Sequence, residues 1–170
     1  MIQPTPARLF TAWFGIGSNV DAERNVASGI SELRQSMDDL VLSPVYRAPA
    51  VGFEGDDYIN LVARGRTHLT PWELKRFLAG IEDRHQRRRD VPKFSDRTLD
   101  IDILLYEDLW MITPGLDIPR AEILHAAHVL EPLADLDPDL RHPSMGKTLG
   151  RIRQETDTAE ARLERLDLTF

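Results

Sequence analysis

Four segments of the chain carry the short apolar runs or the period-two alternation that strands require: residues 9–17, 40–47, 58–66 and 99–106. Apolar residues recur at helical spacing after residue 19, from Val26 to Met37, and again in a second helix that opens with the capping box Thr70-Pro71-Trp72-Glu73. The predicted order is therefore strand, helix, strand, strand, helix, strand.

This order is the βαββαβ pattern of a ferredoxin-like fold, an α+β class in which helices pack on one face of an antiparallel sheet. Residues 120–133 and 148–166 predict helical additions at the C-terminal end. The length of 170 residues predicts a single domain over residues 1–170.

Local signals mark the ends of these elements. Gly15 and Gly17 are expected to end the first strand as turn residues, and Asn19 to cap the helix that follows. Pro44 predicts an edge or an interruption in the second strand.

Composition excludes several classes of protein. The chain has no cysteine, which removes disulfides, thiolate metal sites and cysteine nucleophiles. A net charge of −7 argues against a general nucleic-acid binder. No apolar run approaches the length of a membrane span and no secretory signal is visible, so we expect no membrane partner and a cytoplasmic location.

The strand at 99–106 carries the clearest candidate chemistry. Alternation places Leu99, Ile101, Ile103 and Leu105 on one face, and the carboxylates of the segment Asp100-Ile101-Asp102 on the other. On such a strand the Cβ atoms of the two aspartates would lie roughly 6 to 7 Å apart, a separation from which both carboxylates can converge on one or two divalent cations. An Asp-x-Asp pair is also common on a solvated face. Here, however, Leu104 and Tyr106 share the face of the aspartates, which argues against a face that is simply exposed to solvent.

A basic cluster precedes this strand. Six of the 21 Lys and Arg residues lie between positions 84 and 97: Arg84, Arg87, Arg88, Arg89, Lys93 and Arg97. A basic segment is often only exposed charge. Beside two carboxylates, however, it favours a combined metal and phosphate site for a small polyanion.

Other motifs are weaker. Gly15-Ile16-Gly17 lacks the third glycine of a dinucleotide fingerprint, because that position is Val20. Gly146-Lys147-Thr148 lacks the earlier glycine of a phosphate-binding loop and is better explained as a helix start. His125 and His128 have metal-ligand spacing but no evident third ligand, so one exposed and one packed histidine is the simpler interpretation.

Several short motifs occur in a fixed order along the chain. They include Gly15-Ile16-Gly17-Ser18-Asn19, Val45-Tyr46-Arg47-Ala48-Pro49, Asp57-Tyr58-Ile59-Asn60, the strand Arg97-Thr98-Leu99-Asp100-Ile101-Asp102-Ile103, Ile118-Pro119 and Val129-Leu130-Glu131-Pro132-Leu133. Together they resemble the 6-hydroxymethyl-7,8-dihydropterin pyrophosphokinase family. The resemblance implies a ferredoxin-like core and a folate-biosynthesis enzyme. Its members transfer pyrophosphate from ATP to a pterin alcohol and release AMP.

The resemblance also implies roles for individual residues. The implied catalytic residues are Arg87, Arg97, Asp100 and Asp102. Asp100 and Asp102 would hold two Mg²⁺ ions. The implied ATP contacts are Arg87, Arg89, Lys93, Arg97, Ile103 and Arg120. The implied pterin contacts are Ala48, Pro49, Val51, Tyr58, Asn60, Phe94 and His128. The expected partners are these two small molecules, and the expected state is a monomer.

This chain departs from the family at positions near the nucleotide and the pterin: Ala48, Gly115, Asp117, Arg120, Ala126 and His128. Arg120 could supply charge that the altered positions lack, and His128 could stack where the family has phenylalanine. Two alternatives therefore stay open: a diverged paralogue with another alcohol or nucleotide, and a pterin- or nucleotide-binding module without turnover.

Overall fold

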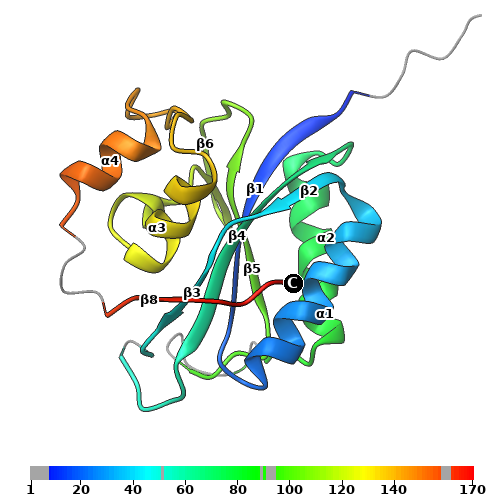
Figure 1. Cartoon of the computed structure of the whole chain (residues 1–170). Helices are drawn as coiled ribbons and strands as arrows, with labels where there is room; N and C mark the ends of the chain where they lie inside the picture. Colours follow the sequence, from blue (N-terminus) through cyan, green and yellow to red (C-terminus); the bar gives the residue numbers. More distant parts are fainter. Residues whose placement is uncertain (1–7, 51, 89, 91–94, 158–161) are drawn as a thin grey trace, which may run out of the picture.

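The computed structural model describes residues 8–50, 52–88, 90, 95–157 and 162–170. An antiparallel sheet lies between two helical layers (Figure 1). Its strands are β1 (Phe10–Ser18), β2 (Asp38–Leu42), β3 (Val45–Ala48), β4 (Tyr58–Thr67), β5 (Asp100–Tyr106) and β8 (Glu164–Leu166). They run in the order β5-β1-β4-β3-β8, and β2 also pairs with β4. The predicted βαββαβ order and α+β class are confirmed.

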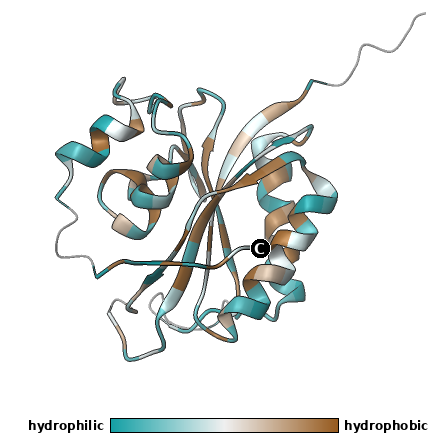
Figure 2. Cartoon of the chain, viewed as in Figure 1, coloured by the Kyte–Doolittle hydropathy of each residue, from teal (hydrophilic) through white to brown (hydrophobic). Residues whose placement is uncertain are grey.

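Helices α1 (Ala22–Ser36) and α2 (Pro71–Arg84) cover one face of the sheet. Their apolar stripes meet inward-facing strand residues such as Phe14, Ile16 and Ile101 in the larger core cluster. Figure 2 shows the resulting division, with hydrophobic strands at the centre and hydrophilic outer helix faces. The capping box at Thr70 and Glu73 is present at the start of α2, as predicted.

A second layer covers the opposite face. It contains the 3-10 turn Ala121–Leu124 and the helices α3 (Ala127–Leu136) and α4 (Leu149–Glu155). Leu130 and Leu133 of α3 pack on this face in a second core cluster. The expectation that helices occupy one face thus holds for α1 and α2 only. The C-terminal additions fill the other face, where part of β1, β4 and β5 would otherwise expose apolar side chains.

Polar contacts fix α3 to the sheet. The Trp13 indole donates a hydrogen bond to Asp137 Oδ2 at 2.7 Å, and Arg64 pairs with the same carboxylate. The Tyr46 hydroxyl donates to Asp135 Oδ2 at 2.6 Å. These contacts hold the C-terminal end of α3 against the sheet.

Two predicted helices are wrong in part. The predicted helix 120–133 is a 3-10 turn followed by a break at His125 and Ala126, after which α3 runs through Pro132 to Leu136. The predicted helix 148–166 ends at Glu155, and its last residues form β8. Thr148 does cap α4, since its side chain accepts a hydrogen bond from Arg151 N at 3.3 Å.

The strand predictions hold with two changes. Residues 40–47 form β2 and β3, interrupted at Ser43-Pro44 as Pro44 predicted. The apolar run after β5 forms a hairpin of β6 (Met111–Thr113) and β7 (Leu116–Ile118) around Pro114-Gly115.

A register shift in β5 changes which residues share a face. The pairing of β1 with β5 is irregular between Trp13 and Phe14, opposite Leu105 and Ile103. Beyond this bulge Leu105 joins Leu104 in the α3 cluster, while Tyr106 joins the α1–α2 core. The predicted faces of Leu105 and Tyr106 are therefore wrong, whereas those of Ile101, Ile103 and Leu104 are confirmed.

Close packing of α1 on the strand that carries the aspartates gives a stability prediction. A Cβ added at Gly29 would lie 2.8 Å from Leu99 Cδ2, and Leu99 is fully buried. Gly29→Ala should lower the free energy of unfolding by about 1–3 kcal/mol, because overpacking outweighs the gain in helix propensity.

Gly80→Ala is the matched control, since a Cβ there would meet only Arg84 Nη1 at 3.5 Å. It should raise the free energy of unfolding by up to about 1 kcal/mol. Urea denaturation of the two variants measures both effects. Equal effects would show that contact with Leu99 does not limit this helix.

Candidate active site

Strand register brings the two groups of predicted site residues together. Gly17 of β1 pairs with Asp100 of β5 on one side and with Asn60 of β4 on the other. Because directly paired residues point to the same face, the Asp100 carboxylate and the Asn60 amide share a face across three strands. Two strand spacings separate them, about 10 Å.

Glycine keeps the space between them open. A Cβ at Gly17 would lie 3.1 Å from Asn60 Oδ1, and one at Gly15 would lie 3.3 Å from Leu104 Cδ2. Both glycines lie within β1 and pair on both sides, so the prediction that they end the strand as turn residues is wrong. Their role is to remove side chains between the carboxylates of β5 and the polar residues of β4.

Arginines surround the carboxylates. Arg87 Nη2 donates to Asp100 Oδ1 at 3.0 Å, and Arg97 pairs with the other oxygen of the same group. Arg120 Nη2 lies 3.1 Å from Asp102 Oδ2 and 3.3 Å from Glu122 Oε1. These guanidinium groups come from the segment after α2, the segment before β5 and the segment after β7. Elements distant in sequence thus converge on one pair of acids.

Arg87 also has an unused donor. Its side chain is 12% exposed, and its buried Nε has no hydrogen-bond partner among the residues that the structure describes. A buried donor without an acceptor is costly, so the position favours an anionic ligand that would accept this bond.

The surroundings of Asp102 disfavour the ionised form of its carboxyl group. Burial, followed by the charge of Asp100, raises the pKa of the Asp102 carboxyl, although Arg120 opposes the rise. Two carboxylates on one strand face repel each other until cations neutralise them. The arrangement is typical of a site that a bound cation completes.

Glu82 supports the strand between the two aspartates. Its carboxylate is buried, and Oε1 accepts a hydrogen bond from Ile101 N at 2.9 Å. The bond fixes the backbone of β5 at its outer edge, on the side that does not pair with β1. Sequence reasoning missed Glu82, although an acidic residue on the buried stripe of α2 was a visible signal.

Asn19 joins two loops at the site and does not cap α1, whose N-cap residue is Asp21. The Asn19 Oδ1 atom accepts from Arg97 N at 2.7 Å, while Nδ2 donates to Asp96 Oδ1 at 2.7 Å and to the Asp56 carbonyl at 3.2 Å. Ser18 adds a hydrogen bond to the Thr98 carbonyl at 2.7 Å. The turn after β1 therefore fixes the segment that leads into the carboxylates.

Tyr58 lies beside this junction. Its hydroxyl donates to the Ser95 carbonyl at 2.9 Å. Burial is the main cause that raises the pKa of Tyr58, and the charges of Arg97 and Asp100 also act on it. Ala48 pairs directly with Tyr58 across β3 and β4, and the exposed Pro49 follows. The structure thus groups Ala48, Tyr58 and Asn60 next to the acidic pair.

The remaining residues predicted to contact ligands do not all lie beside the acidic pair. Ile103 points its side chain into the α1–α2 core, away from the carboxylates, so only its main chain is free to meet a ligand there. His125 and His128 are both exposed, so the prediction that one of them packs is wrong. Arg89, Lys93, Val51 and Phe94 lie outside the described residues.

Three residues that differ from the family pattern, Gly115, Asp117 and Arg120, have different local contacts. Gly115 forms the turn between β6 and β7, and its carbonyl contacts the Lys75 ammonium of α2. Asp117 accepts from Thr113 N at 3.3 Å within the same hairpin. Arg120 is anchored through its backbone N–H to the Leu104 carbonyl at 2.9 Å. Of the three, Arg120 alone reaches the acidic pair directly.

The donor set fits magnesium. Mg²⁺ usually takes one or two carboxylates and completes its octahedron with water and substrate phosphates. Asp100 and Asp102 provide the carboxylates on one strand face. Within the described part of the chain, no group of three His, Cys, Asp or Glu side chains could hold a metal alone. A Mg²⁺ ion at this pair would have coordination positions left for water and substrate oxygens.

The family comparison agrees with this geometry. The model of 7,8-dihydro-6-hydroxymethylpterin-pyrophosphokinase (HPPK) matches residues 13–138. The chain belongs to this family. It is 31% identical over 149 residues to the 2-amino-4-hydroxy-6-hydroxymethyldihydropteridine pyrophosphokinase of Aquifex aeolicus, covering 86% of this chain and 92% of the relative. For the enzyme of the same name from Synechocystis the identity is 33% over 161 residues, covering 92% and 82%.

Solved HPPK structures share the fold. The HPPK-DHPS of Plasmodium falciparum, crystallised with pterin and p-hydroxybenzoate, superposes with a TM-score of 0.70 at 12% identity, covering 87% of this chain and 43% of that one. The present chain thus spans less than half of that HPPK-DHPS chain. The predicted family, its enzymatic class and the fold class are confirmed. Among the described residues, no helix is long and apolar enough to cross a membrane.

The junction at Asn19 gives a prediction about the rigidity of the site. Asn19→Ala removes the side-chain bonds to Asp56, Asp96 and Arg97, so the free energy of unfolding should fall by about 1–3 kcal/mol. Amide exchange at Arg97 should also become faster.

Asn25→Ala is the control, because the Asn25 side chain bonds only the nearby Val20 carbonyl, at 2.6 Å, in the same turn. It should leave exchange at Arg97 unchanged. If both variants accelerate that exchange equally, Asn19 has no special part in holding the segment.

The raised pKa of Asp102 predicts how stability depends on pH. A carboxyl in the unfolded chain ionises near pH 3.9, so the folded state holds this proton to higher pH than the unfolded state. Stability therefore falls as pH rises through this window, and the ionised group opposes folding at neutral pH.

Asp102→Asn should raise the melting temperature at pH 7, and the difference should shrink toward pH 3. Scanning calorimetry across this range provides the measurement. Asp108→Asn, at an exposed position outside the site, controls for loss of one negative charge. A difference that grows in acid would contradict the assigned environment of Asp102.

Proposed function

We propose that this chain performs the reaction of its family, the transfer of pyrophosphate from ATP to the hydroxymethyl group of 6-hydroxymethyl-7,8-dihydropterin. The products are AMP and the pterin diphosphate, an intermediate of folate biosynthesis. The observation that carries the proposal is the row Asp100, Gly17, Asn60 across β5, β1 and β4. The proposed metal and phosphate site at Asp100 and the proposed polar pocket at Asn60 are thus about 10 Å apart, a separation that supports the proposal.

In this proposal Asp100 and Asp102 hold two Mg²⁺ ions. The ions would bridge the phosphates and neutralise charge at the reacting phosphorus. The two carboxylates could bind two Mg²⁺ ions because each ion would take its further oxygen ligands from the triphosphate.

The arginines are proposed to bind the triphosphate. In the structure Arg87 and Arg97 neutralise Asp100, and Arg120 neutralises Asp102. When cations take over that neutralisation, the guanidinium groups can turn to phosphate oxygens, which they bind with paired N–H donors. Arg89 and Lys93 are proposed to add further contacts to the triphosphate.

The reaction forms a bond between the pterin hydroxyl oxygen and the β-phosphorus and breaks the bond from that phosphorus to the oxygen of AMP. Positively charged donors placed around the β- and γ-phosphates stabilise the charge that spreads over their oxygens. The residues of the chain mainly provide positioning and charge, and phosphoryl transfer needs little more.

The pterin pocket is proposed to include Asn60, Tyr58, Ala48, Pro49, Val51, Phe94 and His128. The Asn60 amide is 7% exposed and offers both a donor and an acceptor to the ring edge. The charge of Glu122 acts on the pKa of both His128 and Asp102, which supports including His128 in the proposed pocket. A cytoplasmic monomer that binds no nucleic acid stays a prediction.

Asp100→Ala and Asp102→Ala test the metal site. Each should lower kcat for AMP release by about 10²-fold or more, because each removes a ligand that places positive charge at the reacting phosphates. AMP is measured by chromatography with ATP, Mg²⁺ and 6-hydroxymethyl-7,8-dihydropterin.

Asp108→Ala provides the control and should retain full activity. AMP release that survives both site substitutions would remove the aspartates from the mechanism. A panel of related alcohols and nucleotides, assayed with the unaltered chain, separates the family reaction from a diverged specificity. Ligand binding without AMP release would indicate a binding module.

A further inference from the structure

The last residues of the chain form a structure that the family match does not include. Residues 162–170, here called the C-terminal strap, follow the matched range 13–138. The strap contains β8, which pairs antiparallel with β3 through Val45–Leu166, Tyr46–Arg165 and Arg47–Glu164. It therefore gives β3 a second neighbour, opposite β4.

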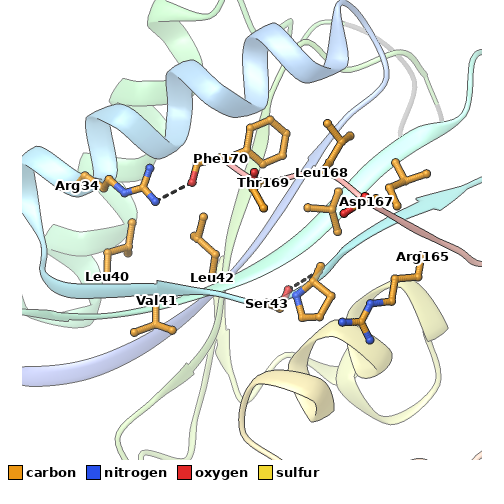
Figure 3. A pocket seen from close by; sticks show the side chains of 13 residues that line it. Arg34, Leu40, Val41, Leu42, Ser43, Arg165, Asp167, Leu168, Thr169 and Phe170 are labelled. Carbon is orange, nitrogen blue, oxygen red and sulfur yellow. Dashed lines mark hydrogen bonds between the residues drawn. The ribbon is translucent and has the colours of Figure 1, made fainter.

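Side chains strengthen this pairing. Arg47 Nη1 lies 2.9 Å from Glu164 Oε2. Three alternating residues of the strap, Leu166, Leu168 and Phe170, pack against the larger core. Arg34 of α1 donates to the Phe170 carbonyl at 2.8 Å, so the strap crosses from the edge of the sheet to a helix (Figure 3).

The attachment is incomplete along its length. A cavity of about 790 Å³ lies between residues 165–170 of the strap and residues 40–45, with Arg34 at its border. Figure 3 shows Leu40, Leu42 and Leu168 around this space. Because the strap borders this open space, fewer contacts hold it than hold the central strands, and we expect it to open at a lower free energy than the main core.

The strand that the strap holds leads into the proposed pterin pocket. β3 ends at Ala48, which pairs with Tyr58 and is followed by the irregular residues Pro49 and Ala50. Since β3 has only 4 residues, loss of one neighbour removes a large part of its support. We propose that the C-terminal strap is a positioning element for the alcohol substrate, acting through β3 on Ala48 and the loop after it. This inference rests on the proposed function.

The sheet order predicts a selective effect. β8 and β5 are the opposite edges in the order β5-β1-β4-β3-β8. Release of the strap should therefore change the pterin side of the site and leave the metal and triphosphate side intact.

The test compares two variants that release or remove the strap with a full-length control. Leu166→Asp combined with Leu168→Asp places charge on the buried side of the strap, and a truncation after Leu163 removes β8. Thr169→Asp adds charge at an exposed position of the same strap and is the matched control. The measurements are KM for 6-hydroxymethyl-7,8-dihydropterin, KM for ATP, and amide exchange over residues 45–50 and 164–170.

The double variant and the truncation should raise KM for the pterin alcohol roughly fivefold or more, with KM for ATP unchanged. Exchange at residues 45–50 should become faster in both, and Thr169→Asp should match the unaltered chain. An unchanged KM for the pterin alcohol with a released strap would overturn the proposal, as would equal rises in both KM values.

Loss of folding in both variants would also overturn it, because the strap would then belong to the folding core. If the unaltered chain releases no AMP, the proposed function fails by itself. The exchange measurement still decides whether the strap positions residues 45–50, since unchanged exchange there overturns the proposal without any assay of activity.

Discussion

The pairing of β1 with both neighbours is the constraint on which the site depends. β1 places Gly17 between Asp100 and Asn60, and Gly15 between Asp102 and Val62. A slip of one residue in either ladder would turn the whole set of side chains to the other face, exchanging the carboxylates for Ile101 and Ile103. The apolar residues of β5 that face α1 and α2 thus fix the register, and the position of the acids follows from their burial.

The sheet register alone leaves the acidic pair in an unfavourable state, and the surrounding loops correct it. Burial and mutual repulsion disfavour two ionised carboxylates on one strand. Arg87, Arg97 and Arg120 reach them from separate segments, each fixed by a local bond such as Arg120 N to the Leu104 carbonyl. Removing one of these arginines would leave carboxylate charge uncompensated, so the acids depend on the arginines around them.

Sequence patterns predicted those parts of the chain in which local and tertiary preferences agree. Alternation in β5 located Asp100 and Asp102 on one face, and the capping box located the start of α2. The bulge opposite Trp13 and Phe14 could not be predicted, because it arises from pairing with a distant strand and leaves no local mark in residues 103–106.

Asn19 and the C-terminal end illustrate the same limit. A residue suited to a helix cap was used instead to bind Asp96 and Arg97, which lie next to it only in the folded sheet. Residues 164–166 continued a helical pattern but pair with β3, since an exposed strand edge and an apolar surface compete for them. The family match explains why the sequence alone could assign roles to individual residues, which spacing could not do.

The ion pairs of the free site also bear on how substrates bind. Each arginine that now holds a carboxylate must give up that partner before it can hold phosphate, so the free chain has a competing arrangement of the same charges. In the proposed function, cations and triphosphate would offer new partners to the aspartates and to the arginines together, whereas a cation alone would displace Arg87 and Arg97 from Asp100 and leave Arg120 with Glu122. This arrangement would favour binding of magnesium together with ATP over binding of either alone. Among the described residues, the ion pairs behind this coupling join Asp100 to Arg87 and Arg97, and Asp102 to Arg120.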